Sequence, residues 1–371
     1  MSPLILLLSL LGFITGADSV GARPGADLIF VGDAMQHQAQ IDRARKIGGE
    51  AGYDYSDCFR HIAPVITQAD YAVCNLEVPL GGGPDYTGYP CFSAPDSYAV
   101  ALKDAGFDMM LTSNNHCLDR GDRALRRTIT VLDSIGVDHI GTYHDAADRE
   151  ENIPYIREIK GIKFGFLNYT YGTNGIQPRQ GAEVALIDTT RMAREIDMTR
   201  GAGAEILVVA MHWGVEYVLL HNAEQSRLAD FLADKGVDLI IGGHPHVIQP
   251  MEIRHNEREK KDVLIVYSLG NFISNMNTGD TRGGAMVSVR VERDEDGVAR
   301  LKHAGYDTFF SAKPDGEYDN FQVIPSWMPH RIPESQKPHW QLFERSAQRI
   351  FEQHNKGVGR RDRKETGVTA D

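Results

Sequence analysis

Two histidines separated by a single proline follow an apolar run that ends in two glycines. The segment reads Ile240-Ile241-Gly242-Gly243-His244-Pro245-His246. In an extended segment, residues two apart point to the same side. We therefore expect His244 and His246 to aim both imidazoles at one spot without backbone strain. Neutral imidazole is the commonest metal ligand among side chains. The alternative is two turn histidines that are each satisfied by a hydrogen bond.

Donor side chains also follow four other apolar runs, each at its carboxyl end. They are Asp33, Glu77, the pair Asn115 and His116, and His212. Ligand sites of open α/β sheets form at the carboxyl ends of the strands, so these residues are expected to converge with His244 and His246. A single Gly-Asp or Asn-His pair is usually a turn or a cap. Five segments in series are hard to explain as caps, and they predict a metal site.

The elements that must position these residues alternate between strands and helices. Strands are predicted over 27–33, 71–77, 107–112, 137–141, 155–159, 162–169, 205–211, 237–241, 263–267, 284–293 and 299–307. Helices are predicted over 55–69, 96–105, 119–135, 190–200, 223–235 and 340–354. In 119–135 the stripe Leu125, Ile129, Leu132 and Ile135 marks a core-facing helix, and Gly136 ends it. No internal repeat or clear linker is visible, so one α/β domain is expected.

Composition restricts the classes of partner. The chain has 371 residues and a formal net charge of −12, which argues against nucleic acid as a partner. An acidic protein needs a local cation, such as a metal, to handle an acidic substrate. Four cysteines occur without CxxC spacing, so a structural zinc site is not expected. The apolar strand-end positions of Cys74 and Cys117 predict buried thiols.

Both ends of the chain differ from the rest. Residues 4–17 are almost entirely apolar but too short for a membrane span, which needs about 20 residues. They predict a signal peptide over 1–22, with an uncleaved N-terminal anchor as the alternative. The protein is therefore expected at the periplasmic or extracellular face of the membrane. At the other end, the charged residues from 357 onward predict a disordered tail.

The order and spacing of the motifs resemble the calcineurin-like metallophosphoesterases and, more closely, their CapA/PgsA branch, the capsule-synthesis (poly-γ-glutamate) proteins. The similarity spans about residues 28–291. It rests on Gly32-Asp33-Ala34-Met35, Asn75-Leu76-Glu77, Ser113-Asn114-Asn115-His116, His212-Trp213-Gly214-Val215-Glu216-Tyr217, Gly243-His244-Pro245-His246 and Ser268-Leu269-Gly270-Asn271. The resemblance implies a four-layer α-β-β-α sandwich over 23–310, followed by an extension over 311–371 with one amphipathic helix.

The resemblance also implies two positions for divalent metal ions of the Mn, Zn or Fe type, of which one or both are used. Asp33, Glu77 and His246 would face one position. Glu77, as a bridge, would face the other together with Asn115, His212 and His244. His116 would be the acid near the leaving group. Trp213, Glu216, Tyr217 and Asn271 are expected to bind substrate, with a purely structural role as the alternative for the first three.

Two departures from the phosphoesterase pattern weaken the expectation of ordinary phosphatase activity. Met35 stands where a histidine ligand is usual, and His37 is a possible substitute. Leu80 stands where an aspartate would orient His116, although Asp119 is near in sequence.

The resulting hypothesis is a metal-dependent hydrolase or transferase of the cell envelope that helps to make or export an anionic polymer such as poly-γ-glutamate. Its substrate would be that polymer or a small molecule, and its partners membrane-bound synthase or export components. The alternative is a non-catalytic assembly or polymer-binding factor.

Overall fold

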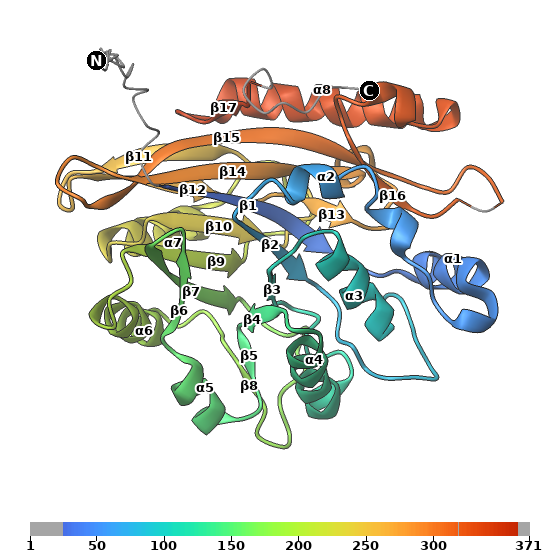
Figure 1. Ribbon diagram of the computed structural model, residues 1–371, viewed down its shortest axis with the longest axis horizontal. Helices are drawn as coiled ribbons and strands as arrows, with labels where there is room; N and C mark the ends of the chain where they lie inside the picture. The colour runs from blue at the N-terminus through green and yellow to red at the C-terminus, as the bar shows by residue number, and fades with distance from the viewer. Residues whose placement is uncertain (1–24, 318, 363–371) are drawn as a thin grey trace, which may run out of the picture.

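The computed structural model describes residues 25–317 and 319–362, so the predicted signal peptide or anchor lies outside the described residues. Two β-sheets pack face to face, and helices cover the outer face of each (Figure 1). This arrangement confirms the predicted α-β-β-α sandwich. None of the helices in the described part is both long enough and apolar enough to cross a membrane.

The larger sheet has nine strands in the order β16-β15-β14-β1-β2-β3-β4, with β13 beside β1 and β17 beside β15. Their bounds are β1 (Gly25–Ala34), β2 (Tyr71–Leu76), β3 (Met109–Leu111), β4 (Asp138–Ile140), β13 (Asn271–Ile273), β14 (Gly283–Arg293), β15 (Ala299–Ala312), β16 (Gln322–Pro325) and β17 (Gly359–Arg360). Strands β1 to β4 run parallel, so their carboxyl ends lie at one edge.

The smaller sheet has six strands in the order β11-β12-β10-β9-β7-β6. These are β6 (Tyr155–Ile159), β7 (Ile162–Thr170), β9 (Ile206–His212), β10 (Leu239–Gly243), β11 (Met251–Asn256) and β12 (Lys261–Val266). Strands β7, β9, β10 and β12 are parallel, and β6 and β7 form the predicted hairpin. A separate pair joins β5 (Thr142–Tyr143) to β8 (Glu183–Val184).

The helices that the structure describes are α1 (Gln38–Gly48), α2 (Ala63–Ile66), α3 (Asp96–Asp104), α4 (Gly121–Ile135), α5 (Ala146–Asn152), α6 (Thr189–Gly201), α7 (Ala223–Asp234) and α8 (Lys337–His354). Alternation along the strands builds the layers, because successive side chains point to opposite faces. Phe30 of β1 and Val208 of β9 both belong to the hydrophobic core between the sheets. Val31 packs outward in the cluster that contains α3, and Val209 packs outward against α6 and α7.

Most predicted elements are present, but several differ, and the short elements α5, β5, β8, β13 and β16 were not predicted. The helix predicted over 55–69 is wrong, because only a 3₁₀ turn at Ser56–Cys58 and the short α2 form there. Helix α1 was not predicted, since it buries only Gln40, Ile41 and Ala44 and lacks a full apolar stripe. The edge strand β11 was also missed, because most of its residues are only half-buried and no apolar run marks it.

The predicted end of α4 and the predicted C-terminal tail have different outcomes. Helix α4 ends where Gly136 adopts a left-handed backbone with φ of 68°, as predicted. The disordered tail is wrong for residues 357–362, because β17 pairs in parallel with β15. Residues 363–371 lie outside the described residues. Cys74 and Cys117 are buried free thiols, as predicted.

Candidate metal centre

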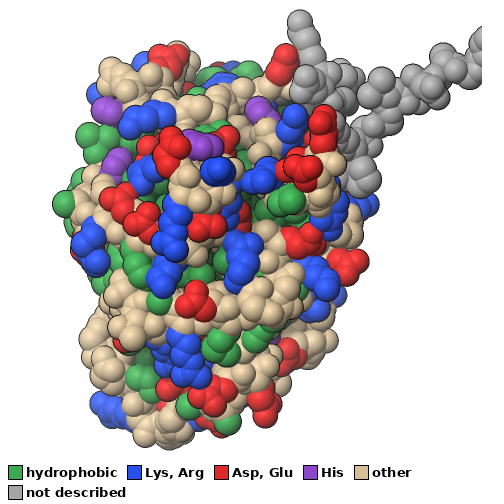
Figure 2. All heavy atoms as spheres, turned by 90° about the vertical axis from the view of Figure 1, so that its left-hand side faces the viewer, with side chains coloured by type: hydrophobic (Ala, Val, Ile, Leu, Met, Phe, Trp, Pro, Cys, Tyr) green, Lys and Arg blue, Asp and Glu red, His purple; other side chains and the backbone are tan. Residues whose placement is uncertain are grey.

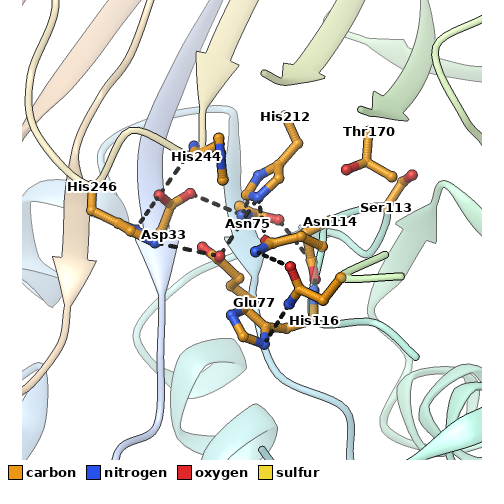
Figure 3. Close-up of polar contacts among 12 residues, drawn as sticks. Asp33, Asn75, Glu77, Ser113, Asn114, His116, Thr170, His212, His244 and His246 are labelled. Atoms are coloured by element: carbon orange, nitrogen blue, oxygen red, sulfur yellow. Dashed lines mark hydrogen bonds and ion pairs between the residues drawn. The ribbon is translucent and has the colours of Figure 1, made fainter. Parts of the chain in front are cut away.

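Carboxylates and imidazoles from both sheets meet where the strands end (Figure 3). Asp33 is the last residue but one of β1, Glu77 follows β2, His212 ends β9, and His244 and His246 follow β10. The possible ligand atoms of Asp33, Glu77 and His246 lie within 4.8 Å of one another, and so do those of Glu77, His212 and His244. These match the two groupings that the resemblance implied, except that the second implied grouping also includes Asn115, whose Oδ1 lies 2.8 Å from Nε2 of His212. Their role as metal ligands stays a prediction.

The turn that carries the two histidines is not the extended segment that was expected. His244 has φ of 97° and His246 has φ of 58°, both in the left-handed region. Such a conformation costs of order 1–3 kcal/mol at a non-glycine residue and is often found at functional sites. The convergence of the two imidazoles is therefore produced by a strained turn, and the expectation of no backbone strain is wrong.

Asp33 braces this turn. Its Oδ2 accepts a hydrogen bond from the backbone N–H of His244 at 3.2 Å and lies 3.2 Å from Nδ1 of His246. Asn75, which pairs with Asp33 across the parallel strands β1 and β2, donates to Oδ1 at 2.9 Å. Asn271 pairs with Asp33 from β13, and its Oδ1 lies 3.1 Å from Nδ1 of His246. The carboxylate is thereby held in one orientation.

His212 faces the cluster from the smaller sheet. Its Nε2 lies 2.8 Å from Oδ1 of Asn115 and 3.5 Å from Oε1 of Glu77. Its ring centroid is 4.8 Å from that of His244. Tyr171, which is 49% exposed, places its ring 4.5 Å from the ring of His244 and forms part of the rim. The cluster is therefore buried but borders on solvent.

Burial and mutual charge separate the pKa values of these groups. Burial lowers the pKa of His212 to about 3 and that of His244 to about 2, so both are neutral at pH 7. Burial opposes protonation of His246 as well, but the charges of Glu77 and Asp33 outweigh it and raise the pKa to about 9. Burial would raise the pKa of Asp33, yet the hydrogen bond and charge of His246 lower it to about 2. Two neutral imidazoles and an ionised carboxylate suit a cation.

The structure gives a reason to expect a divalent metal ion at these side chains that does not depend on resemblance to known proteins. Burial, followed by the charge of Asp33, raises the pKa of Glu77 well above its usual value. Neither carboxyl oxygen of Glu77 accepts a hydrogen bond from the described residues, and Nδ1 of buried His244 has no such partner. Buried polar atoms without partners are rare and need an explanation. A cation between these atoms would supply one.

His116 lies beside the cluster with its own carboxylate. Its Nδ1 is 2.8 Å from Oδ2 of Asp119, and both side chains are buried. The backbone N–H of Phe92 donates to the same oxygen at 2.7 Å, and the Phe92 ring meets the imidazole edge-on at 4.6 Å. Asp119 therefore takes the orienting position for which Leu80, buried in the core, has no suitable group.

The residues predicted to bind substrate separate into different environments. Trp213 is buried in the core between the smaller sheet and its helices, and its Nε1–H donates to the carbonyl of Tyr267 at 2.9 Å, which favours the structural role. Tyr217 is 54% exposed, with its ring 6.2 Å from that of His246. Buried Asn271 contacts His246 and does not reach the surface. The carboxylate of Glu216 lies within 4.8 Å of a ring nitrogen of His244 and of His246.

The two departures from the phosphoesterase pattern have structural counterparts. Met35 is 1% exposed and belongs to the hydrophobic core that also contains Leu80. His37 precedes α1, with its Nδ1 3.3 Å from Oε1 of Gln40 and 3.3 Å from the backbone N of Asn275, and it belongs to neither of the two groups of donors. Sequence reasoning assigned no role to Asn75 or Tyr171. Their positions at the ends of β2 and β7 were the signal that could have indicated them.

A family model described as "Bacterial capsule synthesis protein PGA_cap" matches residues 27–276 of this chain. The chain belongs to the PGA_cap family. This confirms the resemblance to the capsule-synthesis branch.

Two curated proteins illustrate the relationship. The PGA_cap chain is 26% identical over 272 residues to the PGA biosynthesis protein CapA of Bacillus subtilis (strain 168), which covers 72% of this chain and 68% of that protein. It is 28% identical over 284 residues to the capsule biosynthesis protein CapA of Bacillus anthracis, which covers 74% and 65%. The chain thus spans about two thirds of the length of these relatives.

Among solved structures, the chain is similar to the NAD nucleotidase NadN of Haemophilus influenzae, with a TM-score of 0.47 and 8% identity over 91% of this chain and 64% of that chain.

Proposed function

We propose that this PGA_cap protein is a metal-dependent hydrolase or transferase that acts at the cell envelope on an anionic capsule polymer such as poly-γ-glutamate. The two CapA relatives, named for PGA and capsule biosynthesis, support the polymer. The observation that carries the chemistry is the buried cluster in which both oxygens of Glu77 accept no hydrogen bond from the described residues.

Two positions in the cluster suit a divalent cation. Asp33, Glu77 and His246 would hold one ion, while Glu77, His212 and His244, with Asn115 beside them, would hold a second. Imidazole and carboxylate together suit Zn, Fe or Mn. When bound, such an ion polarises a carbonyl or phosphoryl oxygen as a Lewis acid.

His116 is suited to move the proton. Its Nδ1 donates to Asp119, which fixes the tautomer and leaves Nε2 to exchange a proton with a leaving group. The ring of Phe92 against the imidazole limits access of water. Asp119 is thus a positioning residue, and the pair replaces the His–Asp arrangement that Leu80 cannot provide.

Charge explains why an anionic polymer would need the metal. Asp33, Glu77 and Glu216 place three carboxyl groups at the site, and the whole chain carries a formal charge of −12. On the face in Figure 2, basic side chains are interspersed with acidic ones and form no large basic patch. Polymer binding is therefore expected to depend on bound cations.

The test uses the purified full chain, with metal content measured and with phosphoester and γ-glutamyl oligomers as substrates. We expect bound metal and a hydrolysis or transfer activity that is lost in Asn115→Ala and His116→Ala. His116→Ala should keep its metal, whereas His212→Ala and His244→Ala should lose it. Negligible metal content, together with full complementation of capsule synthesis by His244→Ala, would overturn the proposal.

A second candidate function is a non-catalytic assembly or polymer-binding factor. The burial of Met35 and Leu80 in the core favours it, because both phosphoesterase positions lack their usual polar groups. In that case His116→Ala would restore capsule synthesis in a deletion strain as well as the natural chain does.

A further inference from the structure

A third group of donors lies on the solvent side of the cluster. The carboxylate of Glu216 and a ring nitrogen from each of His244 and His246 lie within 4.8 Å of one another. Glu216 is half-buried, whereas both histidines are buried. Each of His244, His246 and Glu77 belongs to two of the three groups, so the groups adjoin one another.

The loop that carries Glu216 is tied to the histidine turn. The backbone N–H of Tyr217 donates to the carbonyl of Pro245 at 2.8 Å, and Tyr217 has φ of 66°. The buried side chain of Gln249 donates to the carbonyl of Val218 at 2.7 Å. Gln249 in turn accepts a hydrogen bond from Gln225 of α7 at 2.8 Å. These bonds hold Glu216 over the imidazoles.

Evidence for a ligand comes from His244, which this group shares with the group of Glu77 and His212. Its side chain is 3% exposed, and its Nδ1 has no hydrogen-bond partner among the described residues. An unpartnered nitrogen at this depth is costly unless something binds it. In the described part of the chain no arginine or lysine forms an ion pair with Glu216, so its carboxylate is not neutralised in that way.

We propose that Glu216 is a metal ligand that completes a set of two imidazoles and one carboxylate with His244 and His246. This inference rests on the proposed metal-binding function and replaces the substrate-binding role that the sequence suggested for Glu216. Two histidines with one carboxylate suit Zn, Fe or Mn and leave coordination positions free. Those positions would face solvent, because Glu216 lies at the open side, and a substrate would enter there.

The proposal gives His246 a second carboxylate-containing group. Met35 lies in the hydrophobic core, and the group of Asp33, Glu77 and His246 consists of one donor atom from each of these residues. Glu216 brings a further carboxylate to His246 from a different segment of the chain.

The test is isothermal titration of the metal-free full chain with Mn²⁺, checked with Zn²⁺. Glu216→Gln keeps the shape and removes the charge, and Glu216→Asp keeps the charge and shortens the side chain. As a control, Glu224→Gln neutralises an exposed carboxylate at the start of α7. A direct ligand predicts that both Glu216 variants lose roughly tenfold or more in affinity, while the control binds as the natural chain does.

Each outcome is decisive. If the natural chain binds Mn²⁺ and Glu216→Gln binds within about twofold of it, this inference is wrong and the metal centre stands. If Glu216→Asp keeps full affinity while Glu216→Gln loses it, Glu216 acts only through its charge, and the inference is again wrong. If the natural chain binds neither ion, both the inference and the proposed function fail.

Discussion

The substitution Glu77→Gln separates a metal ligand from a structural carboxyl group. Burial and the neighbouring Asp33 raise the pKa of Glu77 well above the ordinary 4.5, so its folded pKa exceeds its unfolded pKa. The folded state then binds the extra proton, and stability falls as pH rises above about 4.5. In the metal-free protein, glutamine should match the natural chain near pH 5 and exceed it in stability at pH 8.

A bound cation should reverse this order. At a free concentration of 100 times its Kd, a ligand that binds only the folded state adds about 2.7 kcal/mol. The entropy of unfolding is roughly 2.1 cal/mol/K per residue, or about 0.8 kcal/mol/K for a chain of this size. The natural protein should therefore gain about 3.5 °C in Tm. Glu77→Gln should gain clearly less, because the two donor groups that share Glu77 lose its carboxylate while the group of Glu216 keeps its own.

The assay is calorimetry of the metal-free and Mn²⁺-loaded protein at pH 5 and pH 8. Glu158→Gln, which neutralises an exposed carboxylate on β6, should behave like the natural chain. The reasoning is refuted if Glu77→Gln gains the same Tm increment from Mn²⁺. It is also refuted if metal-free Glu77→Gln is less stable than the natural chain by more than about 2 kcal/mol at pH 8, the amount expected when a structural hydrogen bond is broken.

Three further predictions follow from other contacts. Asp119→Asn should reduce turnover by a factor of about 10²–10⁴, because it alters the tautomer of His116. The metal content measured by mass spectrometry should stay unchanged, and a loss of metal would contradict the prediction. Metal affinity should rise about tenfold per pH unit from pH 6 to 9, because His246, with a pKa of about 9, must release its proton to bind the ion. A metal affinity that does not change with pH over this range would contradict the prediction. Arg149→Met should lower the free energy of unfolding in urea by about 2–3 kcal/mol, because Glu195 loses its buried cation and keeps only half-exposed Arg191 and the hydroxyl of Tyr169 as partners. A change below about 1 kcal/mol would exclude a stabilising pair.

Much of the fold and the membership of the candidate site could be predicted from the sequence. Apolar runs such as 205–211 predict buried strands because burial on both faces requires continuous hydrophobicity. Asp33, Glu77, His212, His244 and His246 stand at the ends of such runs, and parallel strands bring their ends to one edge. The family follows from the same short motifs, whose information is local.

Elements with weak local signals were missed for a related reason. Helix α1 has few apolar residues, and β11 lies at an edge, so burial leaves little periodicity in either. The predicted helix over 55–69 failed because tertiary packing, not propensity, decides short irregular segments.

The sequence by itself determined which residue types stand at the ends of the strands and which family the chain belongs to. Only the tertiary structure decided how those residues divide into groups. It placed Glu216 above the imidazoles, paired Asp119 with His116 and turned Trp213 into the core. The physical reason is distance along the chain. Asp33 accepts a hydrogen bond from the backbone of His244, which lies 211 positions away in the sequence. No local sequence pattern indicates which nitrogen or oxygen atoms remain without a partner after such a contact forms.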